Sequence, residues 1–262
     1  MSVVSILEEW GRTVLTRKEW GAKYESIYQG RRESRPVELP VDYLYSHISV
    51  TIDDGTLTGD FISDMRELER IGYERFKSGI SYNWAIDAVT GMIGEGMPLD
   101  ARGTHTVNDK GIAGFPSQLN EHGHAVVLIG MPGVKPSAQF IRSFAAIRAA
   151  EIEAGVLKRG APIYPHSKFA AKDCPTEAVR TILPAVVSQS NTFDRGDDNV
   201  ALTEADRQWA DKRMQAYALW LDMRSRRAEL LAAKAAGNPA VVTVLQEEYN
   251  AALATWRNAT QS

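Results

Sequence analysis

Apolar runs of strand length recur through the first part of the chain. Residues 125–130 (Ala-Val-Val-Leu-Ile-Gly) are continuously apolar, which is typical of a central strand covered on both faces. Residues 43–50 are dominated by aromatic and β-branched side chains and predict a second strand. Residues 81–87 predict a third strand, which enters a turn at residues 89–91.

Two amphipathic stretches lie among these strands. Residues 61–76 have apolar or small residues at helical spacing, namely Phe61, Met65, Leu68 and Gly72, and charged residues lie between them. Residues 137–154 predict a second helix with Ser137 as its N-cap. Strands that alternate with helices predict an α/β layer fold.

The last part of the chain follows a helical pattern alone. From Thr203, a candidate N-cap, apolar or small residues recur in steps of four and three up to about residue 236, interrupted at Arg224. Gly237-Asn238-Pro239 predicts the end of this helix and the first turn of a second one. The same spacing then continues from Val242 to Trp256. Two such helices joined by a short turn predict an antiparallel helical hairpin.

A polar stretch at residues 188–199 has the composition of a linker. We therefore expect three parts: a domain over residues 1–187, a linker over 188–201 and the helical hairpin over 202–262.

Composition excludes several classes of protein. At 262 residues, with 44% hydrophobic and 24% charged residues, the chain is typical of a globular protein. A formal net charge of −3 gives no general attraction for nucleic acid, and no run of about 18 apolar residues predicts a membrane span. The first residues lack the pattern of a secretory signal, and a single cysteine fits a reducing cytoplasm.

That cysteine is the first candidate for chemistry. Cys174 follows His166 by eight positions, with Lys172 between them, and as the only cysteine it has no internal disulfide partner. Its role is therefore packing, reactivity or metal ligation. Catalytic zinc sites have three protein ligands and one open position, and His47 at the end of a predicted strand could be the third ligand. The alternative is hydrogen-bonded histidines beside a small buried thiol.

His122 and His124 alternate just ahead of the predicted central strand. Alternation along an extended segment places both imidazoles on one face, where they could form a metal site together with His105. Ordinary hydrogen-bonded histidines are the default interpretation.

Short segments spread over residues 14–187 share the order and spacing of one known pattern. They are residues 17–22, 44–47, 80–86, 94–96 and 103–105, Asn120, and His166 with Cys174-Pro175. Together they resemble peptidoglycan-recognition-type zinc amidases, the type 2 N-acetylmuramoyl-L-alanine amidases, which include bacteriophage lysozymes. The resemblance implies a central mixed β-sheet flanked by helices, to which the helical hairpin is appended.

The resemblance also implies roles for single residues. It makes His47, His166 and Cys174 the ligands of Zn²⁺, and it makes Tyr82 and Lys172 the residues that assist catalysis. A phenol can exchange hydrogen bonds with the reacting groups, and an ammonium can stabilise an oxyanion.

Substrate contacts follow from the same resemblance. They fall on His105, Asn120 and Trp84. Glu95-Gly96-Met97 stands where the family has Glu-Gly-Arg, and an extended segment follows it, so we expect a reshaped substrate groove.

The function implied is hydrolysis of the bond between N-acetylmuramic acid and L-alanine in bacterial peptidoglycan. We expect an endolysin, made in the host cytoplasm and acting at the cell wall. The alternatives are a hydrolase in the virion tail and a non-catalytic peptidoglycan-binding or structural virion protein. The hairpin would bind wall polymer, another copy of itself or virion proteins, or would simply pack on the amidase domain.

Overall fold

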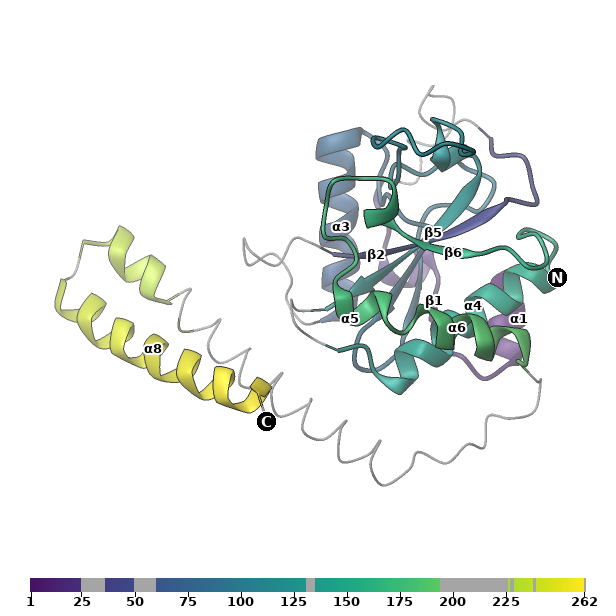
Figure 1. Cartoon of the computed structure of the whole chain (residues 1–262). Coiled ribbons are helices and arrows are strands. Elements are labelled where there is room, and N and C mark those ends of the chain that lie inside the picture. Colours follow the sequence, from purple (N-terminus) through teal and green to yellow (C-terminus); the bar gives the residue numbers. More distant parts are fainter. Residues whose placement is uncertain are drawn as a thin grey trace. The chain divides into compact units, whose positions relative to one another are not determined.

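The computed structural model describes residues 1–24, 36–49, 60–130, 135–193, 226, 229–237 and 239–261 (Figure 1). The chain divides into two compact units, Met1–Ala201 and Leu202–Ser262. None of the described helices is both long and apolar enough to cross a lipid bilayer.

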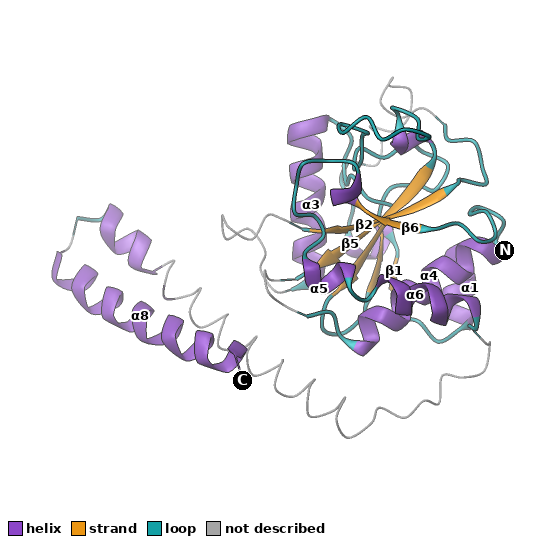
Figure 2. Ribbon diagram, viewed as in Figure 1, coloured by secondary structure: helices purple, strands orange, loops and turns teal. Residues whose placement is uncertain are grey.

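The first unit is built on a six-stranded sheet (Figure 2). Its strands are β1 (Val14–Leu15), β2 (Tyr43–Ile48), β3 (Trp84–Asp87), β4 (Ile93–Glu95), β5 (Gly123–Ile129) and β6 (Ile163–Pro165), in the order β1-β4-β3-β5-β2-β6. β3 and β4 pair antiparallel, and every other neighbouring pair is parallel. The sheet is therefore mixed, as expected, and residues 125–129 of the apolar run belong to the fully buried β5, which ends before Gly130.

Helices cover both faces of this sheet. They are α1 (Val3–Glu9), α2 (Arg17–Trp20), α3 (Phe61–Phe76), α4 (Ala138–Glu153), α5 (Glu177–Arg180) and α6 (Leu183–Asn191). α3 lies on one side, and α4 lies on the other with α1 and α6 packed against it (Figures 1 and 2). The α/β architecture predicted from the sequence is confirmed.

A capping side chain precedes each of the two long helices. Asp60 caps α3 by accepting the backbone N–H of Ser63. Ser137 caps α4 by accepting the backbone N–H of Phe140 at 2.9 Å. The bounds of α3 match the predicted 61–76, because the apolar stripe on which that prediction rested is a local signal.

Alternation along β5 separates two apolar layers. Val127 and Ile129 pack with Phe61 and Met65 of α3 in one cluster. His124 points to the other face, where it meets Glu151 of α4. Because side chains alternate along a strand, the α3 face also receives the odd-numbered residues of β2, which pair with odd-numbered residues of β5.

The expected linker differs from the structure at its start. α6 continues to Asn191, so residues 188–191 are helical, and residues 194–200 lie outside the described residues.

In the second unit, helix α8 runs from Pro239 to Gln261. It follows a helical segment that ends before Gly237, whose φ is +67°. Arg226 pairs with Glu248 at 2.9 Å, and Lys234 donates to Gln246 at 3.2 Å, so side chains on both sides of the turn meet. Thr203, Arg224 and the side chain of Trp256 lie outside the described residues, and a complete hairpin stays a prediction.

Candidate metal centre

Strand pairing brings His47 and His166 together from distant parts of the sequence. His47 lies near the end of β2, between β5 and β6, and its side chain is 2% exposed. Ser46 pairs with Pro165, the last residue of β6, and His166 follows at once in a 3-10 turn. The two imidazole rings lie 4.6 Å apart between centroids. Parallel pairing of β2 with β6 thus juxtaposes two of the predicted ligands.

Cys174 approaches from the loop that follows this turn. Its Sγ lies 3.7 Å from His47 Nδ1 and 3.8 Å from the carbonyl oxygen of Ile48. The backbone N–H of Ser167 donates to the Cys174 carbonyl, so the loop closes back on the segment that carries His166. The thiol is 5% exposed.

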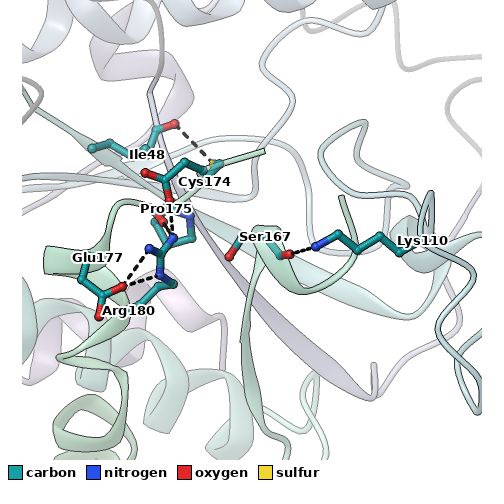
Figure 3. A network of polar contacts seen from close by, with 8 residues as sticks. Ile48, Lys110, Ser167, Cys174, Pro175, Glu177 and Arg180 are labelled. Atoms are coloured by element: carbon teal, nitrogen blue, oxygen red, sulfur yellow. Dashed lines mark hydrogen bonds and ion pairs between the residues drawn. The ribbon is translucent and has the colours of Figure 1, made fainter. Parts of the chain in front are cut away.

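Arg180 of α5 contacts the same loop on both sides of Cys174 along the chain (Figure 3). Its guanidinium donates to the Pro175 carbonyl at 2.7 Å and pairs with Asp173, and these residues flank Cys174 on both sides. It also pairs with Glu177 at 2.8 Å. Lys110 donates to the Ser167 carbonyl at 2.6 Å, so a second cation fixes the turn that carries His166.

The three side chains fit a zinc ion. One ligand atom from each of His47, His166 and Cys174 lies within 4.8 Å of the others, and no other such cluster of three occurs within the described ranges. A nitrogen about 2.0 Å and a sulfur about 2.3 Å from a tetrahedral zinc lie about 3.5 Å apart. The 3.7 Å between His47 Nδ1 and Cys174 Sγ is close to that separation. The donor set, two imidazoles and one thiol, is one that zinc prefers.

Burial sets the protonation of these groups. It lowers the pKa of His166 to about 4, and the nearby charge of Lys172 acts in the same direction. It also lowers the pKa of His47 well below its usual range, with His166 adding to the effect. Burial raises the pKa of the Cys174 thiol. At neutral pH both imidazoles therefore keep a lone pair for a metal, and ligation would displace the thiol proton.

Tyr82 and Lys172 lie at this cluster. The Tyr82 ring is half-buried, 5.1 Å between centroids from His47, and burial raises the pKa of its phenol, with the charge of Cys174 next in effect. Lys172 is exposed on the loop beside Cys174, near enough for its charge to lower the pKa of His166.

His105 lies close to the cluster, whereas Asn120 supports it indirectly. The His105 ring is 5.5 Å between centroids from that of His47 and is 7% exposed. The buried Asn120 side chain accepts the backbone N–H groups of His105 at 3.1 Å and of Thr106 at 2.7 Å. Asn120 thus orders the segment beside the candidate metal ligands, and its amide oxygen is already engaged.

Trp84, the third residue predicted to contact substrate, lies on the opposite face of the sheet from the cluster, so the structure does not bring it together with His105 and Asn120. It is 1% exposed, and its indole N–H donates to Glu151 of α4 at 2.7 Å. A strand over 81–87 would place Tyr82 and Trp84 on one face. β3 begins only at Trp84, however, after an irregular step in which the adjacent carbonyls of Tyr82 and Asn83 accept from Met97 and Gly96.

His122 and His124 do not meet His105 in a second metal site. His124 Nε2 lies 2.9 Å from the Leu99 carbonyl, and its Nδ1 lies 3.0 Å from Glu151, so both ring nitrogens are engaged. His122 lies at the surface, 3.5 Å from Asp42. The interpretation as hydrogen-bonded histidines agrees with these contacts.

Sequence reasoning missed Thr106, Arg180 and Lys110. The Thr106 hydroxyl lies 3.1 Å from His47 Nε2, a contact across 59 positions of sequence. Its position next to His105 was the one local signal. Arg180 follows Glu177 by one helical turn, which is the pattern of an ordinary surface pair.

Comparisons with known proteins identify the fold. No protein-family model matches the chain, and no curated protein matches it. Wild-type Drosophila PGRP-LB matches with a TM-score of 0.53 at 22% identity, over 72% of this chain and 99% of that one. A mutant of Drosophila PGRP-LB in complex with tracheal cytotoxin matches with a TM-score of 0.52 at 22% identity, over 64% of this chain and 92% of that one. Drosophila peptidoglycan recognition protein SD matches with a TM-score of 0.52 at 20% identity, over 68% of this chain and 94% of that one. The first unit therefore has the fold of the peptidoglycan recognition proteins.

Proposed function

We propose that this protein is a zinc-dependent N-acetylmuramoyl-L-alanine amidase, which hydrolyses the amide bond between the muramic acid and the first residue of the stem peptide in bacterial peptidoglycan. The observation that carries the proposal is the cluster of His47, His166 and Cys174 in a peptidoglycan-recognition fold. Both histidines are held neutral by burial, as metal ligation requires.

The chain's own residues would hold the metal and serve the reaction. A zinc ion on these ligands supplies a Lewis acid that polarises the scissile carbonyl and acidifies water. Because the pKa of Tyr82 is raised, its phenol keeps its proton at neutral pH and can donate a hydrogen bond to a substrate oxygen or to the departing nitrogen. Lys172, which is exposed and close enough for its charge to act on His166, would supply a positive charge to stabilise a developing oxyanion.

We also propose a biological role for this activity. Lysis of a host from within, as an endolysin, is our first assignment, and wall opening by a virion tail is the second. The second unit would then bring the catalytic unit to wall polymer, to a second copy or to virion proteins.

The proposal is tested by zinc content and peptidoglycan hydrolysis together. We expect purified protein to carry stoichiometric zinc and to release muramoyl-linked peptides from purified peptidoglycan, with activity lost after chelation. His166→Ala and Cys174→Ser are expected to lower both zinc content and hydrolysis to the level of the chelated control, because each removes a ligand.

His122→Ala is the matched control, since His122 lies at the surface away from the cluster, and it should leave both quantities unchanged. Retention of zinc and cleavage by His166→Ala would show the assignment to be wrong. Zinc binding and wall binding without turnover would instead identify a non-catalytic binding protein.

A further inference from the structure

The hydroxyl of Thr106 lies between two imidazole rings. Thr106 Oγ1 is 3.1 Å from Nε2 of His47 and 3.1 Å from Nδ1 of His105. The three side chains are 2%, 2% and 7% exposed for Thr106, His47 and His105. Hydrogen bonds in such an enclosed position do not exchange freely with water, so their direction determines which ring nitrogen of His47 carries the hydrogen.

The nitrogen of His47 that faces Cys174 is Nδ1, 3.7 Å from Sγ. A neutral imidazole that offers the Nδ1 lone pair to a metal carries its hydrogen on Nε2. That N–H then donates to Thr106 Oγ1, and the threonine hydroxyl donates its own hydrogen to His105 Nδ1. With the chain of hydrogen bonds reversed, the His47 hydrogen would sit on Nδ1 and block the lone pair.

The position of the hydroxyl is fixed by its surroundings. Asn120 Oδ1 accepts the backbone N–H groups of both His105 and Thr106. Gly103 admits the His105 ring at close range, because a Cβ at that position would lie 2.5 Å from His105 Cδ2. Asn120 thus holds the segment beside His47, and the absence of a side chain at Gly103 leaves room for the His105 ring.

We propose that Thr106 is a positioning residue for the metal ligand His47. Its hydroxyl accepts the Nε2–H of His47, selects the tautomer with a free Nδ1 and fixes the ring plane toward Cys174 and His166. Metal-bound histidines characteristically donate their second N–H to a nearby acceptor, and loss of that acceptor costs about 10- to 100-fold in metal affinity. This inference rests on the zinc site of the proposed function.

Two matched pairs of full-length variants isolate the hydroxyl. The first pair compares wild type with Thr106→Val, which lacks the hydroxyl but keeps the shape of the side chain. The second pair compares Thr106→Ser with Thr106→Ala, which differ by the hydroxyl and both lack the methyl group. We expect the Val and Ala variants to bind zinc about 10- to 100-fold more weakly than their partners, measured by competition with a chromophoric chelator at neutral pH. Thr106→Ser should restore wild-type affinity.

Thr104→Val is the control for the same loop. The Thr104 hydroxyl donates to Ser81 Oγ at 2.8 Å and contacts Ser78, and neither of these partners is a residue of the cluster, so zinc affinity should not change. Thermal unfolding of the metal-free variants separates a loss of fold from a loss of ligand positioning.

The outcomes separate the two ideas. If wild type binds zinc and the Ser and Ala variants bind it equally tightly, Thr106 has no role at His47 and the inference is wrong. An affinity loss in Thr104→Val as large as that in Thr106→Val would also overturn it. Absence of zinc binding by wild type would overturn the proposed function, and the inference with it.

Discussion

His124 and Glu151 form a buried charged contact between β5 and α4. Both ring nitrogens of His124 face acceptors, the Leu99 carbonyl and the Glu151 carboxylate, and Glu151 also accepts from the indole of Trp84. Burial by itself would lower the pKa of His124, but the charge and hydrogen bond of Glu151, with the Leu99 carbonyl, raise it above its usual value. The imidazolium therefore links the sheet to α4 on the face away from the candidate metal centre.

His124→Asn should destabilise the protein in a pH-dependent manner. Removal of one partner leaves Glu151 buried without its counter-charge, which costs about 3–5 kcal/mol in the free energy of unfolding. Because the folded-state pKa is raised, the contribution is complete below the unfolded-state pKa of about 6.5 and is lost as pH rises through the folded-state pKa. The difference from wild type should therefore be largest near about pH 6.

Urea denaturation of metal-free protein at about pH 6 and about pH 9 measures this difference. His122→Asn is the control, because its exposed side chain should contribute at most about 0.5 kcal/mol. A His124→Asn effect that grew toward high pH would contradict the charged state assigned to the pair.

Helix α3 shows how a tertiary contact overrides a local preference. Gly72 lies in the interior of this helix, on the stripe that packs against the sheet. Helix propensity alone favours alanine there by about 1 kcal/mol. A Cβ at Gly72, however, would lie 1.7 Å from the carbonyl oxygen of Gly79, so the chain after α3 passes directly over this position.

Gly72→Ala is therefore expected to destabilise the protein by about 1–3 kcal/mol, because the helix and the segment after it must separate. Glu74→Ala in the same helix is the control: its side chain is 57% exposed and pairs with Arg70 at the surface, so its loss should cost at most about 1 kcal/mol. Urea unfolding of both variants measures the two costs. An increase in stability for Gly72→Ala would show that α3 does not approach residue 79 so closely.

The division into two units separates the candidate chemistry from the helical C-terminus. Each residue of the cluster lies within Met1–Ala201, on β2, on the turn after β6 and on the loop before α5. The second unit contributes α8 and its partner segment, which contact each other through Arg226 and Glu248. A unit whose contacts are largely internal should fold without the other.

A chain of residues 1–201 should therefore keep the zinc affinity of the full protein and hydrolyse a small soluble muropeptide at a rate within about twofold of it. On insoluble walls the two proteins should differ if the second unit binds wall polymer. Zinc content and the ratio of the rates on the two substrates provide the measurement. Loss of zinc from the shorter chain would mean that the second unit supports the metal centre.

The amino-acid sequence by itself determined the local elements. Apolar spacing and the Ser137 cap predicted α4, and a continuous apolar run predicted β5, because these signals lie within a few turns or residues of each other. The three ligand candidates could also be named, since resemblance to a family motif identified them before any contact was known. Their proximity in space required the parallel pairing of β2 with β6.

Only the tertiary structure decided which side chains meet. Alternation predicts that neighbouring residues occupy opposite faces, yet it does not say where a strand begins. The irregular step before β3 therefore put Tyr82 beside His47 and Trp84 on the α4 face. The Thr106 hydroxyl reaches His47 across 59 positions, and Asn120 holds the segment that carries it by accepting the backbone N–H of Thr106. Such contacts depend on the path of loops, and no local pattern of residues encodes that path.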